Sequence, residues 1–331
     1  MCSGCCLASA LGAPVTSIQG NTGLWKVFTA ETLQAGKASF STSYDRFHRS
    51  PGDLTVSTFG FAASVGITDR FEAGVNFEAI RHVRAGRRDH LSFGQQALGF
   101  FGNKTPGSPP LLSELMPDSS RVPQLRLPPA PAGALTGAAG YYNLLPFAGF
   151  VTAGQAAGFV SLGAKYRIVS ETTGAPLGLA IHSYFSVPIH KGIDFLLTHP
   201  VGSADLQFGF DGILSKSIGE SAELHWNAGF RHINQPAHVS VFRLAKEVPL
   251  GFGLTIPRRH RVQFMMESTA EVFVGGHTPN TTFGPEDPVD ITAGLRARFA
   301  RSFSFSAGYR RPLNQFEGDR NGFVVTLSYN K

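Results

Sequence analysis

Apolar and polar residues alternate with a period of two along most of the chain. Near the C-terminus, for example, Ile291, Leu295 and Phe299 fall on one face of a segment, whereas Arg296 and Arg298 fall on the other. Successive side chains of a β-strand point to opposite faces, so this period predicts strands with one apolar and one polar face. The polar faces are also rich in Gly and Ser, which suits a confined lumen better than a free surface.

The alternation predicts about twelve strands. Most of them have the roughly 9 to 11 residues, or slightly more, that a tilted strand needs to cross a lipid bilayer. The predicted strands cover residues 37–46, 55–67, 71–81, 157–169, 177–187, 204–215, 221–232, 247–256, 261–274, 289–299, 302–311 and 322–330.

The connections between these strands alternate in length. The short ones cover residues 68–70, 171–176, 217–220, 257–260 and 300–301, and the long ones cover 47–54, 83–156, 188–203, 233–246, 275–288 and 312–321. A soluble β-sandwich has no reason to keep its short turns at one end, whereas an outer-membrane barrel has short periplasmic turns and long outer loops. The sequence therefore predicts an all-β protein, a transmembrane antiparallel up-and-down barrel with both termini on the periplasmic side.

Composition supports this class and excludes others. Hydrophobic residues make up 42% of the 331 residues, charged residues only 16%, and the mean hydropathy is −0.00. The chain is too apolar for disorder and too poor in charge for a long coiled coil. The longest uncharged run, 127–164, is interrupted by four prolines, so it does not predict a membrane helix.

The N-terminal residues suggest export rather than chemistry. All three cysteines, Cys2, Cys5 and Cys6, lie here, and no second pair or nearby His completes a zinc site. The segment Leu7–Ala10 ends like a secretory cleavage site, so we interpret residues 1–19 as the remnant of a signal peptide and a short tail. A lipoprotein signal is the weaker alternative. We predict no metal and no cofactor.

Several motifs carry a resemblance to a known family. The opening Gly20-Asn21-Thr22-Gly23-Leu24-Trp25, with the following segment 28–36, is similar to the opening of bacterial outer-membrane barrels of the OmpA-like superfamily; further matches cover residues 66–72, 162–166, 288–296 and 307–311. The resemblance implies an outer-membrane barrel over residues 20–331. It specifies no activity. Many such relatives carry a C-terminal peptidoglycan-binding domain, which we do not expect here, because the sequence stops at the last predicted strand.

The last strand suggests partners. Phe323, Val325, Leu327 and Tyr329 share one face, as in the C-terminal strand by which the assembly machinery recognises outer-membrane barrels. The expected partners are this machinery, outer-membrane lipid and lipopolysaccharide, and small solutes. The positive charge is not gathered with stacking aromatic residues on one exposed groove, so we do not expect nucleic-acid binding. The oligomeric state is left open.

Charged residues on the polar faces fall into two layers of the predicted lumen. The layer near the periplasmic end contains Glu72, Lys165, Arg167, Glu223, Arg296 and Arg298, and the outer layer contains Asp45, Glu78, Arg231, Asp290 and Arg310. Because buried charges of mixed sign pair with one another, two interpretations remain. The layers form either a constriction that filters solutes or an ion-pair network that fills the barrel.

We therefore expect a passive, porin-like diffusion channel for small solutes, with a structural barrel of closed lumen as the alternative. The long Pro-rich loop 83–156 is predicted to fold over or into the outer mouth. An outer-membrane hydrolase is less favoured. Glu223 and His225 share a lumenal face, but they lie near the periplasmic end, away from incoming outer substrates.

Overall fold

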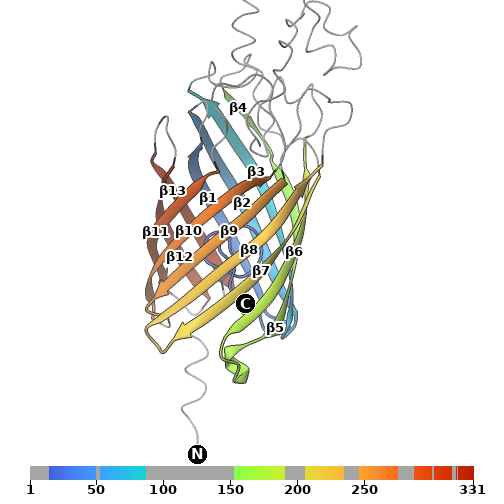
Figure 1. Cartoon of the computed structure of the whole chain (residues 1–331), viewed down its shortest axis with the longest axis vertical. Helices are drawn as coiled ribbons and strands as arrows, with labels where there is room; N and C mark the ends of the chain where they lie inside the picture. The colour runs from blue at the N-terminus through green and yellow to red at the C-terminus, as the bar shows by residue number, and fades with distance from the viewer. Residues whose placement is uncertain are drawn as a thin grey trace, which may run out of the picture.

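The chain forms a closed antiparallel β-barrel in the computed structural model (Figure 1). The structure describes residues 15–49, 53–86, 153–190, 206–234, 246–258, 260–274, 287–299, 302–314, 318 and 320–331. Each strand of the wall pairs with the next wall strand along the chain, and the first strand also pairs with the last, which closes the sheet.

Twelve strands build the wall, and a short additional strand, β4, pairs only with the outer part of β3. Their bounds are β1 (Ala38–Arg49), β2 (Leu54–Thr68), β3 (Phe71–Ala85), β4 (Ala153–Ala156), β5 (Phe159–Val169), β6 (Gly178–Pro188), β7 (Gln207–Ile218), β8 (Ala222–Ile233), β9 (Lys246–Ile256), β10 (Val262–Val274), β11 (Val289–Arg298), β12 (Phe303–Pro312) and β13 (Gly322–Asn330).

The predicted barrel is confirmed, with one difference in the outer rim. β3 continues to Ala85 and pairs there with β4, so the predicted loop 83–156 begins and ends in strand pairing. The prediction that this loop covers the mouth stays a prediction, because most of residues 83–156 lie outside the described residues. In the part of the chain that the structure describes, no helix is long and apolar enough to cross a membrane.

The two faces of the wall have opposite polarity. Large apolar side chains such as Leu162, Phe210 and Leu295 are exposed on the outer surface, whereas charged side chains such as Glu72 and Lys165 are buried inside. In water this arrangement is unfavourable, because exposed apolar area and buried charge both cost free energy. In a bilayer, lipid tails cover the outer face, as expected for an outer-membrane barrel.

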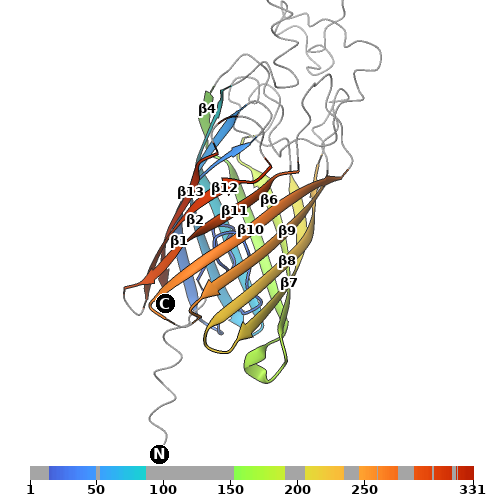
Figure 2. The same cartoon turned by 60° about the vertical axis from the view of Figure 1, so that its left-hand side comes forward.

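The short turns gather at one end of the barrel, where the C-terminus also lies (Figures 1 and 2). Rings cluster near this end, with Phe303 packed against Phe299 and Tyr329 at centroid distances of 6.0 and 4.9 Å. Aromatic residues of this kind occupy the lipid–water interface of membrane barrels. We therefore assign this end to the periplasmic side.

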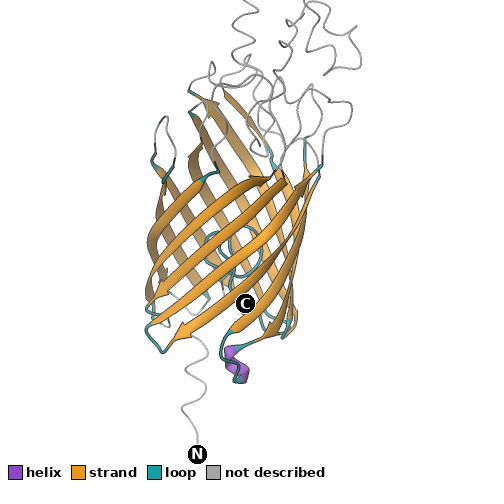
Figure 3. Ribbon diagram, in the orientation of Figure 1, coloured by secondary structure: helices purple, strands orange, loops and turns teal. Residues whose placement is uncertain are grey.

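The segment 15–33 lies inside the lumen instead of in the wall (Figure 3). We call it the plug. Two isolated bridges, Thr16 with Thr22 and Gly23 with Phe28, fold it into compact turns. The sequence analysis included residues from Gly20 onward in the barrel domain and predicted the first strand at 37–46; the wall begins at Ala38, after the plug.

Candidate functional site: the plugged lumen and its outer vestibule

Glu267 of β10 holds the centre of the plug. Its carboxylate is 1% exposed and accepts hydrogen bonds from the backbone N–H groups of Trp25 (2.8 Å), Lys26 (3.0 Å) and Val27 (2.9 Å). Three successive N–H groups that converge on one carboxylate satisfy its charge without a cation. The sequence analysis missed this residue, although the phase of the strand 261–274 puts Glu267 and Glu271 on one face.

A buried ion pair holds the periplasmic part of the plug. Glu72 of β3 accepts the backbone N–H groups of Thr22 (2.7 Å) and Leu33 (2.9 Å). Lys165 of β5 lies 3.7 Å from Glu72 and donates to the carbonyl oxygens of Thr22 (3.1 Å) and Glu31 (2.8 Å). The pair therefore satisfies backbone donors with its anion and backbone acceptors with its cation.

Neutral side chains of the wall also hold the plug. We call them, together with Glu267, Glu72 and Lys165, the seat of the plug. Asn227 of β8 accepts the N–H of Phe28 (2.6 Å) and donates to its carbonyl oxygen (3.0 Å), in the manner of a strand partner. The indole N–H of Trp25, a fully buried side chain, donates to Ser306 of β12 at 3.0 Å. The plug thus contacts strands from across the barrel.

Inward-facing glycines make room for the plug. A Cβ atom added at Gly308 would lie 2.7 Å from the Trp25 ring, and one added at Gly74 would lie 2.5 Å from the carbonyl oxygen of Gly20. Contacts this short cannot occur without movement of the neighbour. The wall and the plug are therefore complementary in shape as well as in hydrogen bonding.

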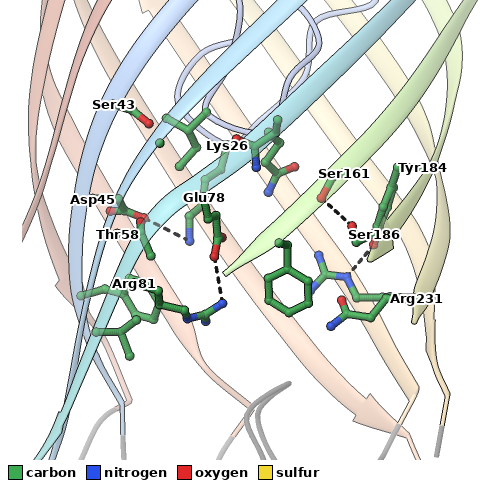
Figure 4. Close-up of a pocket in the computed structure, with 18 of the residues that line it drawn as sticks. Lys26, Ser43, Asp45, Thr58, Glu78, Arg81, Ser161, Tyr184, Ser186 and Arg231 are labelled. Carbon is green, nitrogen blue, oxygen red and sulfur yellow. Dashed lines mark hydrogen bonds and ion pairs between the residues drawn. The ribbon is translucent and has the colours of Figure 1, made fainter. Parts of the chain in front are cut away.

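A vestibule of about 210 Å³ lies between the plug and the outer mouth. Figure 4 shows side chains from the wall and Lys26 of the plug around it. A single water needs about 10–15 Å³ by this kind of measure, so the vestibule admits a small solute together with water. Its charged lining consists of four cations and four anions, Lys26, Arg49, Arg81, Arg231, Asp45, Glu78, Glu247 and Glu271.

Most of the vestibule charges are paired. The pairs are Asp45 with Arg310 (2.8 Å), Arg49 with Asp290 (2.9 Å), Glu78 with Arg81 (3.1 Å) and Arg231 with Glu247 (2.7 Å). All five residues of the predicted outer layer take part in these pairs. Arg49, Arg81 and Glu247, which complete them, were not among the predicted site residues.

The predicted periplasmic layer surrounds the plug. Besides Glu72 and Lys165, Arg167 pairs with Glu31 at 2.5 Å, and Arg296 donates to the carbonyl oxygen of Gly23 at 3.3 Å. Glu223 lies 3.8 Å from Arg258 and interacts electrostatically with Arg298. Much of this layer therefore holds the plug, a role that the sequence analysis did not foresee.

One ionisable group at the periplasmic rim, outside the membrane-spanning strands, has a shifted pKa. Burial acts to raise the pKa of Glu171, but hydrogen bonds from Lys216 and Ser217 outweigh it and hold the pKa below its usual range. The Lys216 ammonium and the Ser217 N–H each lie 2.8 Å from the carboxylate. They connect the β5–β6 turn to the end of β7.

The lumen contains no group of three or more potential metal ligands within the described ranges. A buried Ser–His contact does occur, with Ser215 Oγ 2.8 Å from His225 Nδ1. The same Ser215 oxygen accepts the N–H of Ala30 at 2.9 Å, so the plug covers this pair.

The fold resembles that of solved outer-membrane barrels. The COG4313 outer membrane channel from Pseudomonas putida F1 superimposes with a TM-score of 0.52 and 11% identity, over 91% of this chain and 97% of that chain. The NanC porin (TM-score 0.45, 7% identity, 87% and 98% of the chains) and the KdgM porin (TM-score 0.42, 7% identity, 87% and 98%) are less similar. No protein-family model and no curated protein matches the sequence. The likeness to the first structure therefore establishes the fold, that of an outer-membrane β-barrel.

Proposed function

We propose that this protein is a passive, porin-like channel for small polar solutes, narrowed by its plug, in the outer membrane of a bacterium. One observation carries the proposal: the outer half of the lumen is a charged vestibule whose floor is the plug. A hollow polar interior inside an apolar wall provides a path for solutes that the bilayer itself excludes. The likeness to a solved outer-membrane channel supports the same class by analogy of fold.

A structural barrel with a closed lumen is the second candidate. The observation that favours it is the quality of the plug seat, in which Glu72, Lys165 and Glu267 are all at most 1% exposed and satisfy the plug backbone. A plug that never leaves this seat and admits no path around it stops conduction.

Single-channel recording in planar bilayers separates the two candidates. The wild-type protein is compared with a variant that lacks residues 15–33, after both have shown heat-modifiable migration on a gel. A channel gives discrete steps in the wild type and larger steps without the plug. If the folded wild-type protein shows no conductance and the variant without the plug conducts, the barrel is closed. The same assay on a variant that lacks residues 105–150 tests the predicted loop, whose removal should raise the conductance.

We propose no catalytic role for the chain. Ser215 and His225, which otherwise resemble a nucleophile and its base, serve to seat the plug at Ala30. A hydrolase activity that is lost on His225→Ala, in a variant that still folds, contradicts this.

The finer family assignment is also a proposal. We assign the chain to the OmpA-like superfamily on its sequence motifs, and a profile built from close homologues of this chain tests the assignment. Recognition of the last strand by the barrel assembly machinery is proposed on the apolar face of Phe323, Val325, Leu327 and Tyr329. Changing Phe323 and Tyr329 together to Ser should lower the amount of folded barrel in cells.

A further inference from the structure

Lys26 places an ammonium group in the vestibule without a hydrogen-bonding acceptor among the described residues. Its backbone is fixed by Glu267, and its side chain extends from the plug toward the outer mouth (Figure 4). The nearest carboxylate oxygen, on Asp45, is 3.9 Å away, and Asp45 already pairs with Arg310 at 2.8 Å. The Phe47 ring, 5.0 Å from the ammonium, adds a weak cation–π contact only.

Glu271 of β10 places a carboxylate in the same vestibule. The side chain makes no hydrogen bond and no ion pair within 4 Å to a described residue, but it acts electrostatically on both Lys26 and Arg231. The hydrogen bonds of Arg231 go instead to Glu247 at 2.7 Å and to the Tyr184 hydroxyl at 2.5 Å. Among the described residues, one cation and one anion of the vestibule thus have no hydrogen-bonding partner.

The opposite charges of Lys26 and Glu271 decide which charged solutes the vestibule favours. A simple anion is attracted by Lys26 and repelled by Glu271, and a simple cation meets the reverse. A molecule that carries a carboxylate and an ammonium satisfies both groups at once, with charge-assisted hydrogen bonds at each end. The formal balance of four cations and four anions leaves no net attraction for either simple ion.

We propose that the vestibule binds small zwitterions of the amino-acid type, with the ligand carboxylate on Lys26 and the ligand ammonium on Glu271. The inference rests on the proposed channel function, since it names the class of solute that the channel admits. The vestibule then acts as a selective binding site on the outer side of the plug. The four ion pairs around it hold the other charged side chains of the lining in place, whereas the ammonium of Lys26 and the carboxylate of Glu271 make no hydrogen bond to a described residue.

The test measures binding separately from conduction. Saturation-transfer NMR on the full-length protein in nanodiscs compares glycine with acetate, which lacks the ammonium, and with methylammonium, which lacks the carboxylate. Glycine should bind about tenfold or more tightly than either simple ion, because each of them loses one charge-assisted contact. Equal binding of acetate and glycine overturns the proposal in favour of an anion site.

Variants locate the site. Lys26→Gln and Glu271→Gln should each weaken glycine binding about tenfold, whereas the exposed rim changes Lys37→Gln and Glu220→Gln, which remove the same charges elsewhere, should not. The double variant K26E/E271K reverses both signs and should restore glycine binding with the ligand turned round. Single variants that bind glycine like the wild type overturn the proposal. If the wild type conducts ions but does not prefer glycine, this inference fails while the channel function stands; if glycine binds but no current flows, the channel function fails instead.

Discussion

Replacing Glu267 by Gln should loosen the plug while leaving the wall intact. The carboxylate accepts three backbone N–H groups, from Trp25, Lys26 and Val27, at 2.8 to 3.0 Å. A hydrogen bond to a charged group contributes about 1.5–3 kcal/mol, roughly twice as much as one between neutral groups. Gln keeps one acceptor oxygen but loses the charge.

The expected cost is therefore about half of each of the three hydrogen bonds, or roughly 2–4 kcal/mol in total. At 1.36 kcal/mol per factor of ten, the ratio of undocked to docked plug rises by about 30-fold to several hundred-fold. The backbone ladder from β9 through β10 to β11 does not involve the Glu267 side chain, so the barrel itself should still form.

Trp25 provides the readout. The chain has two Trp residues, and Trp226 lies on the outer surface, so a Trp226→Phe background leaves Trp25 as the only indole. Because Trp25 is fully buried, an aqueous quencher such as iodide should reach it only after the plug moves. Glu267→Gln should increase both quenching and channel conductance.

The matched control is Glu271→Gln. It removes the same charge from the same inward face of β10, four residues along, where the side chain holds no plug N–H. It should leave the quenching of Trp25 unchanged. If Glu267→Gln behaves like this control in a folded barrel, then the three hydrogen bonds do not hold the plug and the reasoning is wrong.

Three further changes test the seat and the rim. Gly308→Val should displace Trp25, because even a Cβ would lie 2.7 Å from its ring, and iodide quenching of Trp25 like that of the wild type would contradict this. Lys165→Met should weaken plug docking by about 3–5 kcal/mol, since it leaves a buried carboxylate without its cation; adding Glu72→Gln should recover part of the loss in the same quenching assay, and no recovery would argue against the pair. Glu171→Gln should lower barrel stability at pH 7 by at most about 1 kcal/mol, because Lys216 is 45% exposed. The pKa of Glu171 is lowered in the folded state, so its contribution is present above its unfolded pKa and disappears as pH falls through the folded pKa. Melting temperatures of the two proteins should therefore converge in acid, and a gap that persists there would disprove the assignment.

The wall could be predicted from sequence because each of its residues faces one of two environments. Lipid outside and a polar lumen inside impose a period of two, and the short turns mark where each hairpin ends. The predicted strands 71–81 and 322–330, for example, correspond to β3 (Phe71–Ala85) and β13 (Gly322–Asn330). The alternation of β3 breaks at Ala79, an extra residue between the pairs Phe59–Ile80 and Gly60–Glu78, so the sequence pattern does not extend to the outer end of β3.

The plug could not be predicted in this way, because it is enclosed on all sides. Leu24, Trp25, Val27 and Phe28 are all buried although they are nearly consecutive, so no periodicity separates an inner from an outer face. The wall residues that hold the plug could not be predicted either. Glu267 is distant from Trp25 in the sequence, and only the closure of the barrel brings the two together.

A signal for the plug is nevertheless present in the wall. On β3 the inward residue after Glu72 is Gly74, and on β5 the inward residue before Lys165 is Gly163; an added Cβ at either glycine would come within 2.8 Å of plug atoms. A lumen filled with water needs no such pairing, because side chains of any size can extend into it. At these two places the glycine gives the plug backbone space, and the neighbouring charge satisfies its N–H or C=O groups. In this barrel, the two combinations Glu72 with Gly74 and Lys165 with Gly163 mark the depth at which the plug backbone lies.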